Sequence, residues 1–309
     1  MAIFIRTCVL LVCLVAAFVY EATRSAPAPC PTQHVPVASA FRTGGPSTAV
    51  AAAQSDGRTD LPLRNSPREA RALLRDATLA ALDLVAAATG NRMGHTGDAR
   101  EQTLKLWALI DEHVPFAGTV CEIGFNVGHS AAIAVTASSA TSFLAFDCGG
   151  KPSVTDGFAL LARLFPAVSW EFVEGNSVVT LPTYAGTHMG TTCDVIHIDG
   201  AHDGPYPAAD FDNARRFARA DGKTLVIFDD CNCATEWCVT PLAVFKSALS
   251  EGLISELPDG ASFLSVDGRK KGSCLGWISR RNDATPIVVP TAVKVHNEMR
   301  PVQVQCNFN

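Results

Sequence analysis

The chain has 309 residues, of which 48% are hydrophobic and 18% are charged, so it is long enough to bury a core of ordinary size. Its formal net charge is -5, whereas a protein that binds DNA or RNA needs a basic surface to neutralise phosphates. The composition therefore indicates a globular protein and excludes nucleic acid as its expected partner.

The N-terminal segment combines a single charge with an apolar run. Arg6 is followed by uninterrupted apolar residues over 8–20, and a basic residue ahead of such a run tends to stay on the cytoplasmic side. We predict that residues 1–25 are a signal peptide or a membrane anchor. The rest of the chain is then expected in the lumen of the secretory pathway, on a single-pass anchor. Secretion, or organelle targeting through a cleaved leader, is the alternative location.

The following residues, 26–61, are rich in Ala, Pro, Ser, Thr and Gly and show no hydrophobic period, which predicts a disordered linker. Order is expected to begin at Ser66 and Pro67, the N-cap and first residue of a helix. A second helix is expected to bury Leu104 and Trp107. We predict one domain over 62–285 and an unassigned C-terminal tail over 286–309.

The central part of the chain changes period, because short apolar runs alternate there with helix-length segments. Nearly continuous apolar strands of this kind are typical of a parallel sheet that is covered on both faces. The last two runs are joined by turn-forming residues, which predicts a hairpin at one edge. The fold class is therefore α/β, a doubly wound, mostly parallel, seven-stranded Rossmann-like sheet with a C-terminal antiparallel hairpin. The predicted strands are 118–123, 142–146, 169–173, 194–198, 224–228, 262–266 and 274–279.

The eleven cysteines do not show the even spacing of a small disulfide scaffold. We predict that most of them, including Cys121, Cys148 and Cys193, are free and buried like small hydrophobic residues. A second group does not match the paired knuckles of zinc sites, and a disulfide within it stays open if the domain faces an oxidising lumen. This group is Cys231, Cys233, Cys238 and Cys274.

A glycine motif follows the first predicted strand. Glu122, Gly124 and Gly128 form an E-x-G-x-x-x-G turn that opens a helix, at the sheet edge where doubly wound folds bind ligands. Asn126 stands where a dinucleotide fingerprint has its second glycine, which disfavours nicotinamide or flavin binding. Asp147 ends the second strand, where a carboxylate can hold the hydroxyls of a ribose. A tight turn without a ligand is the alternative reading of the glycines alone.

Together these motifs resemble class I S-adenosylmethionine (SAM)-dependent methyltransferases, especially the metal-dependent O-methyltransferases of the catechol and macrolide-sugar types. The resemblance covers about 120–232 and the closing hairpin. It implies that the glycine turn holds the methionine part of SAM, that the acidic residue after the second strand holds the ribose, and that the G-x-S step after the third strand meets the adenine. The cofactor-binding residues implied are Glu122, Gly124, Asn126, Gly128, Ser130, Asp147, Gly175, Asn176 and Ser177.

Carboxylates follow two further strands, Asp199 after the fourth and Asp229 and Asp230 after the fifth. Neighbouring parallel strands lie about 4.8 Å apart, so these oxygens can meet on one ion, and oxygen ligands suit Mg²⁺ or Mn²⁺. The resemblance implies that the three aspartates bind such a cation. Carboxylates that cap helices or form ion pairs at the rim are the alternative.

A histidine, His202, lies three residues beyond Asp199, where the macrolide-sugar enzymes have a base. An imidazole can take a hydroxyl proton near neutral pH, so we predict that His202 is catalytic. We assign His129 and His197 to structural roles.

The predicted function is metal-assisted methyl transfer from SAM to a hydroxyl group of a small molecule or sugar. A non-catalytic cofactor-binding relative is the alternative from another class, and the missing middle glycine makes a nucleotide-dependent oxidoreductase the weakest reading. The expected partners are the small acceptor and, through the N-terminal segment, a membrane.

Overall fold

The structure is a computed structural model that describes residues 63–91, 100–266, 270–280, 292–295 and 298–301. The chain divides into the units Met1–Asp60 and Leu61–Asn309, and all described residues belong to the second. The predicted signal peptide or anchor at 1–25 and the linker at 26–61 lie outside the described residues, as does most of the tail at 286–309. None of the helices in the described ranges is long and apolar enough to cross a membrane.

Two helices precede the sheet, after a short 3-10 turn η1 (Leu63–Asn65): α2 (Arg68–Ala88) and α3 (Arg100–His113). The first begins one residue later than predicted, since Pro67 is its N-cap and no side chain caps it. In α3 Trp107 is buried as predicted, but Leu104 is 40% exposed. Gln102 is buried in its place because its amide bonds to Asp229 at the sheet edge.

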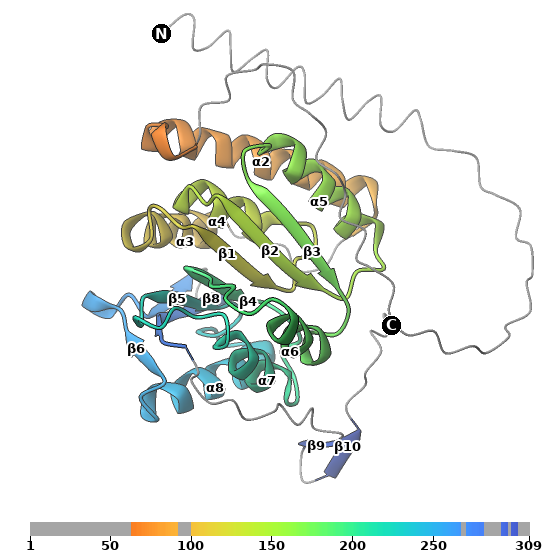
Figure 1. Cartoon of the computed structure of the whole chain (residues 1–309), viewed down its shortest axis with the longest axis vertical. Coiled ribbons are helices and arrows are strands. Elements are labelled where there is room, and N and C mark those ends of the chain that lie inside the picture. The colour runs from red at the N-terminus through yellow and green to blue at the C-terminus, as the bar shows by residue number, and fades with distance from the viewer. Residues whose placement is uncertain (1–62, 92–99, 267–269, 281–291, 296–297, 302–309) are drawn as a thin grey trace, which may run out of the picture. The chain divides into compact units, whose positions relative to one another are not determined.

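The predicted fold class is confirmed (Figure 1). The sheet runs in the order β3-β2-β1-β4-β5-β8-β6, with β7 paired to β8. β1 to β5 are parallel, and β8 is antiparallel to β5, β6 and β7. The β7–β8 hairpin was predicted, whereas the three-residue β6 is too short to show a period. The strands are β1 (Thr119–Ile123), β2 (Ser142–Asp147), β3 (Ser169–Glu174), β4 (Val195–Ile198), β5 (Thr224–Phe228), β6 (Ile254–Glu256), β7 (Phe263–Val266) and β8 (Lys271–Ile278).

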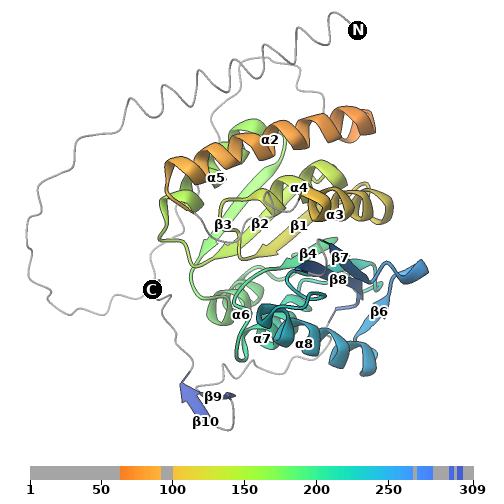
Figure 2. The ribbon, with the colours of Figure 1, turned by 180° about the vertical axis from the view of Figure 1, so that it is seen from behind.

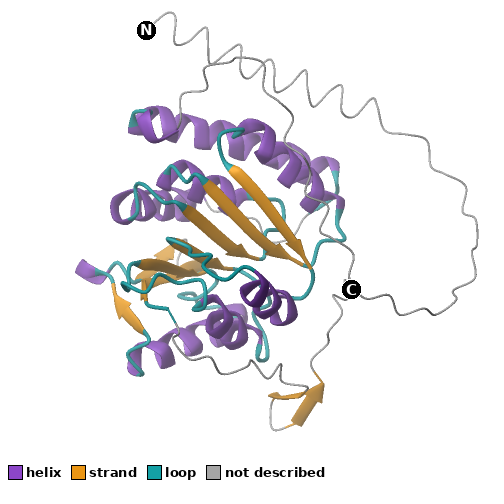
Figure 3. Cartoon of the chain, viewed as in Figure 1, coloured by secondary structure: helices purple, strands orange, loops and turns teal. Residues whose placement is uncertain are grey.

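Helices cover both faces of this sheet, as Figure 2 shows from behind and Figure 3 by element type. On one face α2 and α3 pack with α4 (His129–Ser138) and α5 (Pro152–Leu164). On the other lie α6 (Ser177–Thr187), α7 (Tyr206–Ala214) and α8 (Val239–Ser250). Strand order reverses between β1 and β4, and doubly wound sheets bind ligands at such a point. The remaining elements are η3 (Glu236–Cys238), η4 (Pro258–Gly260), and β9 (Ala292–Val295) with β10 (Glu298–Pro301), which form a separate two-stranded antiparallel sheet.

Disulfides replace free cysteines in the core, so the prediction for Cys121, Cys148 and Cys193 was wrong. Cys121 on β1 is bonded to Cys193, which precedes β4, with their Cα atoms 5.9 Å apart, and Cys148 is also disulfide-bonded. Parallel pairing of β1 with β4 brings the first two together across 72 residues, a proximity that sequence spacing does not reveal. The second group, left open above, forms the disulfides Cys231–Cys274 and Cys233–Cys238.

Candidate functional site

The carboxyl ends of the five parallel strands form one row of site residues. Four backbone hydrogen bonds link the end of each strand to the end of its neighbour in the sheet. These bonds fix the distance between one strand end and the next. The strand ends of this row therefore bring the predicted cofactor residues and the predicted acidic residues to one edge of the sheet. The bonds are Gly175 N to Asp147 O at 2.8 Å, Gly124 N to Phe146 O at 2.8 Å, Asp199 N to Ile123 O at 2.8 Å and Asp229 N to Ile198 O at 3.0 Å.

In the turn after β1, two glycines let the backbone lie closer to neighbouring atoms than a side chain would allow. Gly124 has φ +89°, and a Cβ there would lie 1.9 Å from the carbonyl oxygen of Asp199. Gly128 has φ +98° and is the N-cap of α4, but it supplies no side-chain hydrogen bond to the first turn. The N–H groups of a first turn without a side-chain cap suit an anionic ligand group such as a carboxylate.

The turn is joined to Asp147 at the end of β2. Its carboxylate accepts from the backbone N–H of Asn126 at 3.0 Å and from that of Gly149 at 2.8 Å. Asn126 has φ +50°, and its side-chain oxygen accepts from Asn91 Nδ2 at 2.6 Å. Asn91 was missed by the sequence reasoning because it lies just beyond α2 and belongs to no motif.

Glu122 is buried in β1 and faces His197 of β4. His197 Nδ1 lies 2.8 Å from Glu122 Oε1, and Glu122 Oε2 is buried without a hydrogen-bond partner among the described residues. Burial raises the pKa of Glu122, because it disfavours the charged carboxylate. Burial alone would lower the pKa of His197, but the hydrogen bond to Glu122 outweighs this effect and raises the pKa of His197 to about 9. The hydrogen bond to Glu122 thus stabilises a proton on the His197 ring.

The other residues predicted to hold the cofactor lie where the sequence placed them. Ser130 is buried in the first turn of α4. Gly175 follows β3 with φ +136°. The side chain of Asn176 caps α6 by accepting from the N–H of Val178 at 3.0 Å, and Ser177 begins that helix.

His202 lies between two of the predicted acidic residues. Its Nε2 is 3.3 Å from Asp199 Oδ1, and its Nδ1 is 3.3 Å from Asp230 Oδ2. Burial lowers the pKa of His202, but the bonds to both carboxylates outweigh this effect and raise it to about 10. The two aspartates therefore stabilise a proton on this ring. The other two histidines are buried and paired as structural residues, His197 with Glu122 and His129 with Asp83.

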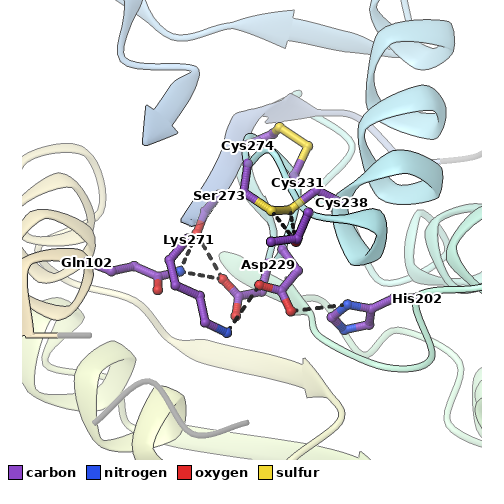
Figure 4. Close-up of a disulfide and its surroundings, with 11 residues drawn as sticks. Gln102, His202, Asp229, Cys231, Cys238, Lys271, Ser273 and Cys274 are labelled. Atoms are coloured by element: carbon purple, nitrogen blue, oxygen red, sulfur yellow. Dashed lines mark hydrogen bonds and ion pairs between the residues drawn. A yellow bond between two sulfur atoms is a disulfide. The ribbon is translucent and has the colours of Figure 1, made fainter. Parts of the chain in front are cut away.

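Three further residues, missed in the sequence, complete the acidic cluster (Figure 4). Asp229 Oδ1 accepts from Gln102 Nε2 at 2.7 Å and from Ser273 Oγ at 2.9 Å. Lys271 Nζ lies 3.4 Å from Asp230 Oδ1. Burial would raise the pKa of Asp230, but His202 and Lys271 hold it below its usual value.

The predicted divalent-cation site at Asp199, Asp229 and Asp230 does not fit this donor set. Among the described residues, no three His, Cys, Asp or Glu side chains are grouped to hold a metal ion. Asp230 faces the ammonium group of Lys271 at 3.4 Å, and a positive charge at this distance would repel a cation bound to the same carboxylate. No step of the reaction is therefore assigned to a metal.

Comparisons with known proteins agree with this arrangement. Residues 121–231 match the family described as "Methyltransferase domain". Among solved structures, the O-methyltransferase from Bacillus cereus in complex with SAH is 20% identical, with a TM-score of 0.51, over 66% of this chain and 91% of that one. Cofactor-bound Rv0187 from MTB is 19% identical, with a TM-score of 0.52, over 70% of this chain and 99% of that one. These similarities show a shared fold. No curated protein matches the chain significantly.

Proposed function

We propose that this chain, a class I methyltransferase by its family match and its fold, transfers the methyl group of SAM to a hydroxyl oxygen of a small molecule or sugar. The observation that carries the proposal is the row of strand ends. Backbone hydrogen bonds between neighbouring strand ends hold the glycine turn, Asp147 and Asp199 side by side. The side chain of His202 then contacts Asp199 and Asp230.

The cofactor end of this row is suited to SAM in charge as well as in shape. The uncapped first turn of α4 can receive the carboxylate of the methionine part, and the free oxygen of Glu122 can receive its ammonium group. Asp147 is held at the end of β2 for the ribose hydroxyls. SAM supplies an electrophilic methyl group on a sulfonium.

The acidic end of the row is suited to handle the proton of the acceptor. Methylation of a hydroxyl forms the O–CH₃ bond, breaks the S–CH₃ bond and releases the hydroxyl proton. His202 takes this proton in its neutral form, after the proton that it holds near neutral pH has been released to solvent. Asp199 and Asp230 then stabilise the imidazolium that results. The solved relative from Bacillus cereus, named as an O-methyltransferase, supports an oxygen acceptor.

The disulfides support a location for this reaction. Disulfides form and persist in oxidising compartments and are rare in the cytosol, and the described residues contain Cys121–Cys193, Cys231–Cys274 and Cys233–Cys238. We therefore propose that the domain lies in the lumen of the secretory pathway and that the N-terminal segment, predicted to be an anchor or signal peptide, directs it there.

A methyl-transfer assay tests this function. The full chain is incubated with SAM that carries a labelled methyl group and with a panel of catechols, phenols and sugars, and the products are separated by mass. We expect label on oxygen of at least one hydroxyl compound, with stoichiometric S-adenosylhomocysteine. Label on nitrogen or carbon only would contradict the oxygen acceptor.

A further inference from the structure

A lysine stands among the three carboxylates of the site, and it belongs to a different strand from all of them. Lys271 begins β8, and its Nζ lies 3.4 Å from Asp230 Oδ1. Its pKa is raised: burial lowers it, but the charges of Asp230, Asp229 and Asp199 outweigh burial. Two cationic groups, Lys271 and His202, thus lie among the three aspartates, of which Asp199 has a pKa raised to about 7 by burial and by the charge of Asp229.

The backbone holds Lys271 in this place. The residue after it, Gly272, accepts a hydrogen bond at 2.9 Å from the N–H of Cys231, the residue after Asp230. A Cβ on Gly272 would lie 2.3 Å from the carbonyl oxygen of Asn232, so only glycine allows the strands to come this close. The Cys231–Cys274 disulfide crosslinks the same two segments (Figure 4).

The other residues of the cluster surround this ammonium group rather than a metal ion. Gln102 and Ser273 donate to the same oxygen of Asp229, so these hydrogen bonds stabilise the charge of that carboxylate. His202 bridges Asp199 and Asp230. A divalent cation placed among the aspartates would be repelled by Lys271 at close range, where charges interact strongly.

We propose that Lys271 is the resident cation of this methyltransferase, standing where a divalent metal ion would otherwise neutralise Asp199, Asp229 and Asp230. The inference rests on the proposed function for its setting, because the lysine then lies at the acceptor end of the site. Lys271 neutralises the cluster and positions Asp230 for His202. Methyl transfer by this chain accordingly needs no divalent ion.

Manganese binding to the oxidised full chain tests the inference without an acceptor. Mn²⁺ is titrated into wild type, Lys271→Met and Lys271→Gln, and free Mn²⁺ is followed by electron paramagnetic resonance. We expect no site-specific binding in wild type up to the highest Mn²⁺ concentration used. In both variants we expect a Kd at least about tenfold below that concentration, since a like charge has been removed from the three carboxylates. The neighbouring Lys270→Met, which removes an exposed lysine charge, is the matched control and should behave as wild type.

A loss of structure cannot imitate this result, because an unfolded cluster gains no metal affinity. Wild-type binding of Mn²⁺ that disappears in Asp230→Asn would overturn the proposal, and so would the absence of a gain in both Lys271 variants. SAM binding, measured on the same samples, reports separately on the proposed function. If SAM fails to bind while the Lys271 variants gain Mn²⁺, the proposed function fails and the cation assignment stands.

Discussion

Removal of the Cys231–Cys274 disulfide should destabilise the domain strongly. In the double variant Cys231→Ala, Cys274→Ala the unfolded chain loses a crosslink that closes 43 residues. The chain-entropy relation gives a cost of about 4 kcal/mol for a loop of this length. Because a domain of this kind has a total stability of about 5–15 kcal/mol, the loss should be easy to measure.

The second disulfide of the same region provides a matched control. Cys233–Cys238 spans only 5 residues, for which the same relation gives about 2 kcal/mol. All four cysteines are buried, so the truncation to alanine costs a similar amount in both double variants. The difference between the two variants, about 2 kcal/mol, therefore isolates the effect of loop length.

Urea unfolding under non-reducing conditions, followed by circular dichroism, measures both variants against wild type. Counting thiols in the denatured wild type checks that the cysteines are oxidised. Equal losses in the two double variants, or free thiols in the wild-type protein at Cys231 and Cys274, would refute the reasoning from the disulfides and the oxidising location that rests on it.

Three further changes test the site. His202→Ala should lower kcat by a factor of about 10²–10⁴, with a smaller effect on the KM of the acceptor. Raising the pH should restore part of the rate, because the acceptor hydroxyl then ionises in solution. A kcat equal to that of wild type at every pH would show that His202 is not the base. Gly124→Ala should unfold the sheet edge, since the new Cβ would lie 1.9 Å from the backbone carbonyl oxygen of Asp199. A native circular dichroism spectrum with normal thermal stability would contradict this. Asp147→Asn should lower the affinity for SAM by about 10- to 100-fold in calorimetry, as expected for lost hydrogen bonds to a charged group. Asp156→Asn, which changes an exposed carboxylate, is the control and should keep wild-type affinity.

The strand ends of the site were predictable because their signals are local. Glu122, Gly124 and Asp147 each stand where an apolar run meets a turn, and the carboxyl ends of parallel strands share one edge. The same local reading placed Asp199 and His202 correctly on this edge.

The partners of those residues were not predictable, because they come from distant segments. Lys271 lies in a turn-rich stretch and was interpreted only as part of a hairpin, although β8 carries it to Asp230. Gln102 belongs to a helix whose apolar period pointed to Leu104 as buried, and only the contact with Asp229 explains its burial. The charge of Lys271 beside the aspartates was not predicted for the same reason, since a charge supplied by another strand leaves no trace near the aspartates in sequence.

The central claim, that the strand-end row binds SAM, is tested most directly by calorimetric titration of the full chain with SAM, S-adenosylhomocysteine and NAD. We predict that SAM and S-adenosylhomocysteine each bind once per chain and compete with one another, and that NAD produces no heat of binding. Binding of NAD without binding of SAM or S-adenosylhomocysteine would contradict the claim.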